Sequence, residues 1–335
     1  MAISSIHISH GSGTGLSELL HSVVLPALLG DFESVLEDAA VLDCEKGRLA
    51  FTTDSFVVHP IEFPGGDIGK LAACGTINDI AMMGGIPKHL AVSLILEEGL
   101  DCAVLDRVLR SLRKICEENE VDVRCGDTKV VEHGKGDGVY ITTTGLGVIP
   151  AGRHLSAAHG RAGDAVLVSG PIGLHGITIL AQRKSLGFAS EAVSDCAPLS
   201  GCVETLLAAV PSTRAMRDAT RGGCAAVLNE IAQSSGVTIR LRQRDIPVPP
   251  IVASACSFLG MDPLLIANEG RFVALVPGKE TDRALAALHG HPLGDGACVI
   301  GSVESRGRFP VIIETTIGGI RPVEVPPGRL LPRIC

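Results

Sequence analysis

The chain has 335 residues, a length typical of two domains, and 46% of them are hydrophobic, which suffices for substantial cores. A formal charge of −8 without any basic block argues against a general binder of nucleic acid or of an anionic membrane. No apolar run reaches the roughly 18 residues of a membrane-spanning helix, and the start lacks the pattern of a secretion signal.

The 11 cysteines are scattered and form no C-x-x-C pair, so the sequence signals neither a zinc site nor a redox pair. Most lie in apolar surroundings, which indicates small core residues in a reducing, cytoplasmic compartment. The exception is Cys335, the last residue, because no following chain can help to bury its thiol.

The first half of the chain alternates predicted strands and helices. Segments rich in Val, Ile and Thr predict strands at residues 49–58, 89–96, 121–127 and 139–149. Residues 67–83 predict a helix whose small side chains allow close packing. Residues 101–120 predict an amphipathic helix with Asp101 as its N-cap.

The second half again mixes the two kinds of element. Residues 165–170 and 272–277 predict strands, and residues 222–236 predict a helix that ends at a glycine. From about residue 318 the chain is rich in proline and glycine and has no periodicity, which predicts a flexible tail.

A polar segment rich in glycine and alanine, residues 150–164, predicts the domain boundary. The predicted division is an amino-terminal domain of residues 1–150, a carboxy-terminal domain of residues 151–317 and a tail of residues 318–335. The fold class is therefore α/β, with two domains and a mobile end that carries Cys335.

Four aspartates of the first half stand at strand ends or in glycine-rich turns: Asp38, Asp54, Asp79 and Asp127. Asp54 and Asp79 interrupt apolar segments, so each needs a hydrogen-bonding or cationic partner. Converging carboxylates repel one another unless a hard divalent cation joins them, and Mg²⁺ with a nucleotide phosphate fits this need. The alternative is that each aspartate caps a helix or turn.

Other residues suit phosphate binding or proton transfer. The usual phosphate loop is absent, but HGSGTG at residues 10–15 and DATRGG at residues 218–223, with Arg221, could present helix starts to a phosphate. A flexible lead-in and a plain helix cap are the respective alternatives. Lys129 and Glu269 are candidate general bases if burial tunes their pKa, and each could instead be structural.

Taken together, these blocks resemble one family. FTTDSFVVHPIEFPGGDIGKLAACGTINDIAMMGGIP, GDTKVV, DATRGG, DPLLIANEG and the terminal PRIC are similar to hydrogenase maturation factors of the HypE family, and PRIC is the most specific mark. That family belongs to the superfamily of aminoimidazole ribonucleotide synthetase, selenophosphate synthetase and thiamine-monophosphate kinase. The resemblance implies a homodimer that pairs mixed amino-terminal sheets, an α/β carboxy-terminal domain, and ATP with Mg²⁺ held by aspartates.

The resemblance also implies a reaction. In the family, the carbamoyltransferase HypF loads the terminal thiol with a carbamoyl group, and ATP drives its dehydration to a thiocyanate. The cyanide then passes to iron on the HypC–HypD scaffold during assembly of the nickel–iron hydrogenase centre. Carried over to this sequence, Cys335 is the acceptor, and Lys129 and Glu269 suit proton removal. The implied Mg–ATP ligands are Asp38, Asp54, Asp79 and Asp127, with Asp218, Asn229 and Lys70 as further nucleotide contacts beside Arg221.

Two other classes of function fit the same residues. One is a phosphotransferase of the superfamily that acts on a free small molecule, and the other is an assembly scaffold that keeps a nucleotide site only for regulation. The thiol at the end of a tail favours the dehydratase. About fifteen flexible residues span at most ~50 Å, so Cys335 could enter an internal site and also reach a partner.

Overall fold

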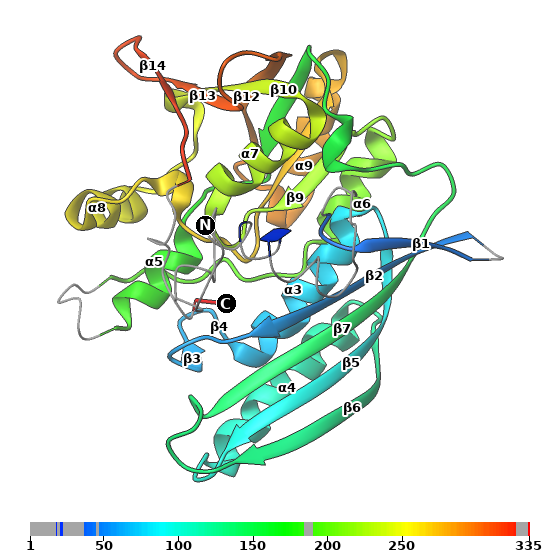
Figure 1. The fold of residues 1–335 in the computed structure, drawn as a ribbon, viewed down its shortest axis with the longest axis vertical. Coiled ribbons are helices and arrows are strands. Elements are labelled where there is room, and N and C mark those ends of the chain that lie inside the picture. Colours follow the sequence, from blue (N-terminus) through cyan, green and yellow to red (C-terminus); the bar gives the residue numbers. More distant parts are fainter. Residues whose placement is uncertain (1–17, 19–20, 23–36, 45–46, 184–189, 326–333) are drawn as a thin grey trace.

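The computed structural model describes residues 18, 21–22, 37–44, 47–183, 190–325 and 334–335 (Figure 1). Within these ranges a five-stranded sheet comes from the first half of the chain and a seven-stranded sheet from the second. A short hairpin pairs β3 (Glu62–Phe63) with β4 (Gly66–Asp67). The predicted α/β fold with two sheet-forming halves is confirmed. None of the helices in this part of the chain has the length and apolar character needed to cross a membrane.

The first sheet is mixed and has the strand order β1-β2-β7-β5-β6. Only β5 and β6 run parallel; the other neighbours are antiparallel. The strands are β1 (Ala40–Cys44), β2 (Gly47–Phe56), β5 (Ile86–Glu97), β6 (Asp122–Val131) and β7 (Val139–Ile149). Four of them lie where the sequence predicts strands.

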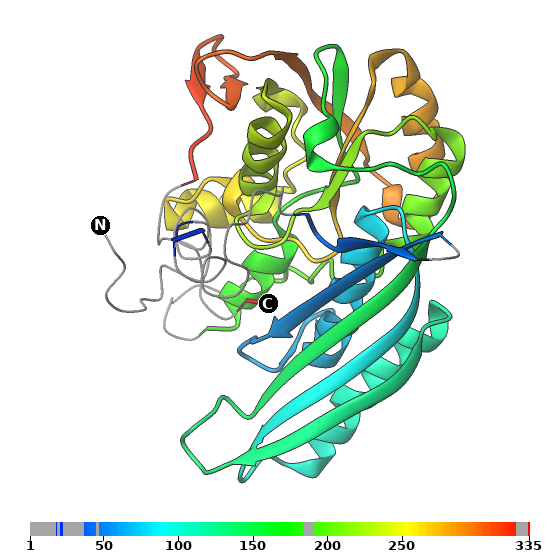
Figure 2. The same ribbon diagram turned by 45° about the vertical axis from the view of Figure 1, so that its right-hand side comes forward.

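Two helices, α3 (Ile68–Met82) and α4 (Cys102–Glu118), cover one face of this sheet (Figures 1 and 2). Both begin at aspartates: Asp67 accepts the N–H groups of Gly69 and Lys70, and Asp101 accepts that of Ala103, as predicted. A Cβ on Gly69 would lie 2.0 Å from the carbonyl oxygen of Val108 in α4. The small residues of α3 therefore let it pack directly against α4.

The second sheet has the order β14-β13-β10-β12-β8-β11-β9, with β10 and β13 parallel and the other neighbours antiparallel. Its strands are β8 (Asp164–Val168), β9 (Ala215–Asp218), β10 (Val237–Arg242), β11 (Phe272–Pro277), β12 (Cys298–Ser305), β13 (Val311–Glu314) and β14 (Ile320–Pro322). The helices of this half are α5 (Leu174–Ala181), α6 (Ser200–Ala209), α7 (Gly223–Ser235), α8 (Pro250–Leu259) and α9 (Thr281–His289).

The central strand β11 is buried on both faces of the second sheet. Val273 and Leu275 enter the core under α7, whereas Phe272, Ala274 and Val276 enter the core under α6 and α9. An uninterrupted apolar run is what a strand buried on both faces requires, and residues 272–277 show it. The end of α3 also enters the core under α6, through Ala81 and Met82, so the first half packs directly against the second.

The predicted start of the flexible tail at residue 318 is wrong. Strand β14 pairs antiparallel with β13, and the Gly318 N–H donates to the carbonyl of Thr315 in the turn between them. A strand of 3 residues that ends in proline is too short for an alternating pattern to reveal it. Residues 326–333 of the predicted tail and the glycine-rich residues 10–15 lie outside the described residues. The domain limit at residue 150 stays a prediction.

Candidate active site

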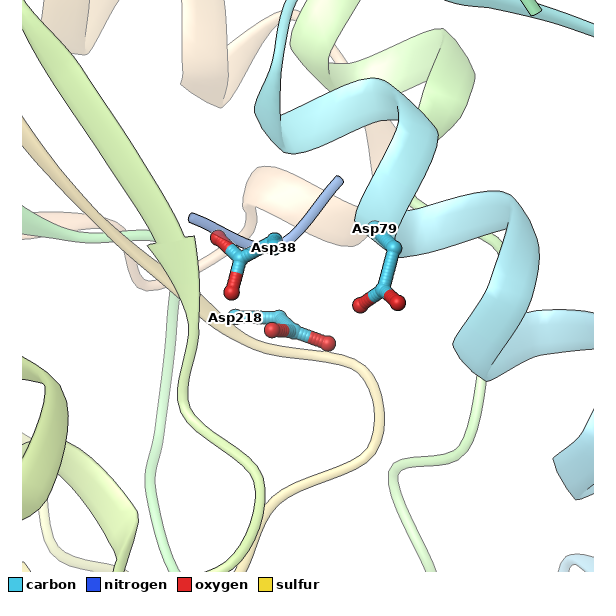
Figure 3. A group of neighbouring side chains, drawn as sticks. All are labelled: Asp38, Asp79 and Asp218. Carbon is cyan, nitrogen blue, oxygen red and sulfur yellow. The ribbon is translucent and has the colours of Figure 1, made fainter. Parts of the chain in front are cut away.

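Three carboxylates converge where α3 meets β9 (Figure 3). Asp38 precedes β1, Asp79 lies on α3 and Asp218 ends β9, and one oxygen of each lies within 4.8 Å of the others. Thr52 Oγ1 donates to Asp79 Oδ2 at 2.8 Å. Asp38 Oδ1 lies 2.9 Å from Nε of Arg217, while its buried Oδ2 has no hydrogen-bond partner among the described residues.

The cluster is electrostatically unfavourable without a cation. Burial raises the pKa of Asp79 well above its ordinary value, and the charges of Asp54, Asp218 and Asp38 raise it further. Burial also raises the pKa of Asp38, against the opposing effect of Arg217, and raises the pKa of Asp218 to about 7. A divalent cation reverses this penalty. The all-oxygen donor set and the free Oδ2 of Asp38 fit Mg²⁺.

Asp54 links the cluster to a second group of side chains. It lies on β2, its carboxyl is hydrogen-bonded to Asp79, and Arg221 opposes the rise in its pKa that burial causes. Arg221 stands in the turn between β9 and α7, close to Cys335, Asp54 and Glu269. The start of α7 after this turn requires glycine, because Gly223 has a positive φ and a Cβ there would lie 2.4 Å from the backbone oxygen of Leu264.

The thiol of Cys335 lies inside the protein and is hydrogen-bonded to the carboxyl of Glu269. Burial raises the pKa of this thiol above its ordinary range, although Arg221 opposes the rise. Burial is the main cause that raises the pKa of Glu269 well above its usual value, and the neighbouring Cys196 raises it further. The Oε1 atom of Glu269 is buried and has no hydrogen-bond partner among the described residues. The thiol of Cys335, the carboxyl of Glu269 as a candidate base and the guanidinium of Arg221 therefore meet beside a candidate magnesium site.

Comparisons with known proteins place the chain in one family. The models of AIR synthase related protein match residues 36–149 with their N-terminal domain and residues 161–314 with their C-terminal domain. Carbamoyl dehydratase HypE of Azotobacter vinelandii is 48% identical over 332 residues, which are 99% of this chain and 97% of that protein. The chain belongs to the HypE family of carbamoyl dehydratases. The resemblance drawn from the sequence is confirmed.

Solved structures of the HypE family share the whole fold. The match in a HypE–HypF complex has a TM-score of 0.86 at 40% identity and covers 92% of this chain and 99% of that chain. A HypE solved in complex with ATP has a TM-score of 0.83 at 43% identity and covers 99% of this chain and 100% of that chain.

Within one chain, the structure does not bring Asp127 and Lys129 to the aspartate cluster. Both lie on β6, where Lys129 Nζ contacts Asp127 Oδ2 at 2.7 Å, and both are exposed. Asp127 on β6 lies opposite Ser93 on β5, which lies opposite Thr142 on β7, which in turn lies opposite Ser55 on β2. Asp127 therefore shares one face of the sheet with Ser55, the chain neighbour of Asp54. Because neighbouring residues of a strand point to opposite faces, Asp127 lies on the uncovered face, whereas Asp54 faces α3 at Gly75.

Two other predicted nucleotide contacts are occupied by structural hydrogen bonds. Lys70 Nζ donates to the carbonyl of Gly65 at 2.8 Å. Asn229 Nδ2 donates to the carbonyls of Ala225 at 2.8 Å and Val323 at 3.0 Å, which ties α7 to the segment after β14. Their roles toward a nucleotide in this HypE family member stay predictions, as do those of Asp127 and Lys129.

The structure changes the expected role of one residue and adds others that the sequence did not single out. Asp218, predicted as a nucleotide contact, groups with the metal-binding candidates, and Arg217 holds Asp38 beside it. The sequence did contain a signal for these two residues, because the charged pair Arg217 and Asp218 ends the otherwise apolar strand β9. His175, which contacts the docked end of the chain, and Ser194, which contacts His175, gave no such signal.

Proposed function

We propose that this enzyme of the HypE family dehydrates a carbamoyl group carried on its own Cys335, with ATP as the phosphoryl donor. The product is a thiocyanate that supplies cyanide to the iron of nickel–iron hydrogenase. The observation that carries the proposal is the docked thiol, hydrogen-bonded to Glu269 and near Arg221, one contact away from the cluster through Asp54. The relatives named carbamoyl dehydratase and the HypE solved with ATP support it.

The proposed chemistry uses these groups in turn. The γ-phosphoryl group of ATP passes to the carbamoyl oxygen, which then leaves as phosphate while the nitrogen gives up its two protons and the C≡N bond forms. Glu269 is placed to take a proton, because that nitrogen is bonded to the carbon that the sulfur carries. Because burial raises its pKa, the Glu269 carboxylate is a stronger base than an exposed glutamate. Arg221 would stabilise negative charge on the transferred group.

Asp38, Asp79 and Asp218 would hold Mg²⁺, which would offset the negative charge of the nucleotide phosphates. Burial of the thiol with Glu269 keeps water from the reacting group, which would otherwise hydrolyse the activated carbamoyl. The docked thiol argues against a phosphotransferase for a free small molecule, because the chain's own end fills the site beside Glu269.

The proposed partners follow from where the thiol must go. HypF would load Cys335, and the solved HypE–HypF complex of a relative supports this partner. The HypC–HypD scaffold would take the cyanide, and we place the exchange in the cytoplasm.

A mass measurement tests the proposed function. With the carbamoyl donor system and ATP, the peptide that contains Cys335 should gain one carbamoyl group and then lose one water. Cys335→Ala should show neither change. Turnover of ATP with a free small-molecule acceptor, undiminished after removal of residues 331–335, would instead establish a superfamily phosphotransferase.

A homodimer through the uncovered face of the first sheet is part of the proposal. This face exposes five large apolar side chains from four strands: Leu42, Phe51, Ile86, Ile95 and Val148. Helices α3 and α4 cover the other face of this sheet, so an exposed apolar surface on the uncovered face marks an interaction site. Asp127 and Lys129 lie on the same face, so a second copy packed there would bring them into the interface.

Replacing Ile95 by Asp should break this dimer. Lys129 lies opposite Ile95 but already pairs with Asp127, so a carboxylate buried on both sides of the symmetric contact weakens association by at least about a hundredfold. Sedimentation velocity measures the result, and Ile317→Asp, an exposed apolar position of the second half, is the matched control. A wild-type protein that sediments as a monomer, or an Ile95→Asp protein that stays dimeric, would contradict the proposed contact.

A further inference from the structure

The last two residues of the sequence are held by their backbone as well as by the thiol. Ile334 forms an isolated antiparallel bridge with Val58, and its side chain, 3% exposed, packs into the core beside α3. The carbonyl oxygen of Ile334 lies 2.5 Å from Nε2 of His175. Ile334 is therefore held by its own backbone and side-chain contacts, apart from those of the Cys335 thiol.

His175 is fully buried on α5 and is itself fixed by the body of the protein. Its Nδ1 lies 2.8 Å from Oγ of Ser194, and its ring meets the ring of Phe63 edge to face with centroids 5.5 Å apart. Ser194 is fixed in turn: its N–H donates to the carbonyl of Pro64 at 3.0 Å, and its Oγ accepts the N–H of Cys196 at 3.1 Å. One ring nitrogen thus faces the protein and the other faces the tail.

These contacts determine which nitrogen carries the proton. The carbonyl of Ile334 can only accept, so Nε2 of His175 must donate. Burial lowers the pKa of His175, so the ring stays neutral and Nδ1 carries no proton. Nδ1 then accepts the hydroxyl hydrogen of Ser194. The ring presents a single aimed donor to the tail.

We propose that His175 is the positioning residue that docks the tail for dehydration, by donating from Nε2 to the carbonyl of Ile334. This inference rests on the proposed role of Cys335 as carrier. The peptide bond between that carbonyl and Cys335 is rigid, so only φ and χ1 of Cys335 separate the held group from the sulfur. Holding the carbonyl aims the thiol, with its cargo, at Glu269 and Arg221.

The same contact sets how often the thiol is available outside the site. While docked, the thiol is buried and its raised pKa suppresses the reactive thiolate, so it neither reacts with external reagents nor takes up a carbamoyl group. If the tail docked without this donor, the carbonyl of Ile334 would be buried without a partner, so the hydrogen bond from His175 favours the docked state by roughly five- to a hundredfold. His175 therefore balances loading against dehydration.

Alkylation of Cys335 measures docking without any other component. Cleavage after Glu324 gives a peptide of residues 325–335 whose single cysteine is Cys335, so mass spectrometry follows its reaction with iodoacetamide. His175→Met removes the donor at similar volume and should raise the alkylation rate at least roughly fivefold. His175→Gln keeps a donor at similar reach and should stay near wild type. The control Thr178→Val removes a hydroxyl contact internal to α5 and should leave the rate unchanged.

Dehydration supplies the second readout. In His175→Met, loading of the carbamoyl group should persist while single-turnover dehydration slows, because the thiol is held toward Glu269 and Arg221 in a smaller fraction of the molecules, and His175→Gln should restore it. If His175→Met does not fold, Ser194→Ala, which frees Nδ1, should raise alkylation by a smaller factor. Wild-type alkylation rates in both variants, or an equal rise in Thr178→Val, would overturn the inference. A wild-type protein that never dehydrates its cargo would refute the proposed function instead, since alkylation needs neither ATP nor a carbamoyl donor.

Discussion

Replacing Glu269 by Gln should slow dehydration by about 10²- to 10⁴-fold while leaving the loading of Cys335 intact. Glutamine keeps the volume of Glu269 and can hydrogen-bond the thiol, but it cannot accept the proton that the carbamoyl nitrogen must lose. Loading is expected to survive because it takes place on the undocked tail, away from Glu269. Rapid quenching followed by mass spectrometry of the Cys335 peptide separates the two steps.

The pH profile gives this prediction a second check. The pKa of Glu269 is raised, so its carboxyl is protonated at low pH and becomes a base only as the pH rises through that pKa. Wild-type dehydration should therefore increase with pH, and Glu269→Gln should lack that rise. Glu117→Gln, at an exposed position on α4, controls for the loss of one negative charge. Wild-type rates in Glu269→Gln would show that another group removes the proton.

The fold could be predicted wherever local pattern determines burial. The alternation at residues 139–149 and the apolar run at residues 272–277 match β7 and β11, because each strand's burial repeats within its own sequence. The helix start at Asp101 was visible for the same reason, since a cap acts within a few residues. Strand β14 was missed because its pairing with β13, not its own pattern, makes it a strand.

The site was harder to predict because it depends on which faces meet. Asp54 and Asp127 look alike in sequence, yet the pleat of the sheet sends them to opposite faces. Asp218 joins Asp38 and Asp79 only because the end of α3 packs beside β9, a contact between distant parts of the chain. The chemistry of the carboxylates could be predicted, but the membership of the cluster could not.

Replacing Asp79 by Asn should act in opposite directions on stability and on activity. Without Mg²⁺ the variant should be more stable to unfolding by about 1–3 kcal/mol near pH 8, because one of several crowded, buried carboxylates becomes neutral. With ATP and Mg²⁺ its dehydration rate should fall by about a hundredfold or more, because the cation loses a charged ligand.

The pH dependence of the stability gain follows from the raised pKa values. The folded cluster binds protons that the unfolded chain releases near pH 4, and Asp218 keeps its proton until about pH 7. Between these limits the native state holds more protons, so the stability of the wild-type protein falls as the pH rises. The advantage of Asp79→Asn should therefore be absent near pH 4 and should grow as the pH rises through the raised pKa of Asp79.

Calorimetry at about pH 5 and pH 8, each with EDTA or with Mg²⁺, separates these effects. Mg²⁺ should raise the Tm of the wild-type protein more at pH 8 than at pH 5, because bound protons compete with the ion, and it should raise that of Asp79→Asn less. Asp106→Asn, exposed on α4, controls for net charge. A lower Tm for Asp79→Asn at pH 8 in EDTA would mean that the Thr52 contact outweighs the repulsion. The cluster would then be a structural network, not a site kept open for a cation.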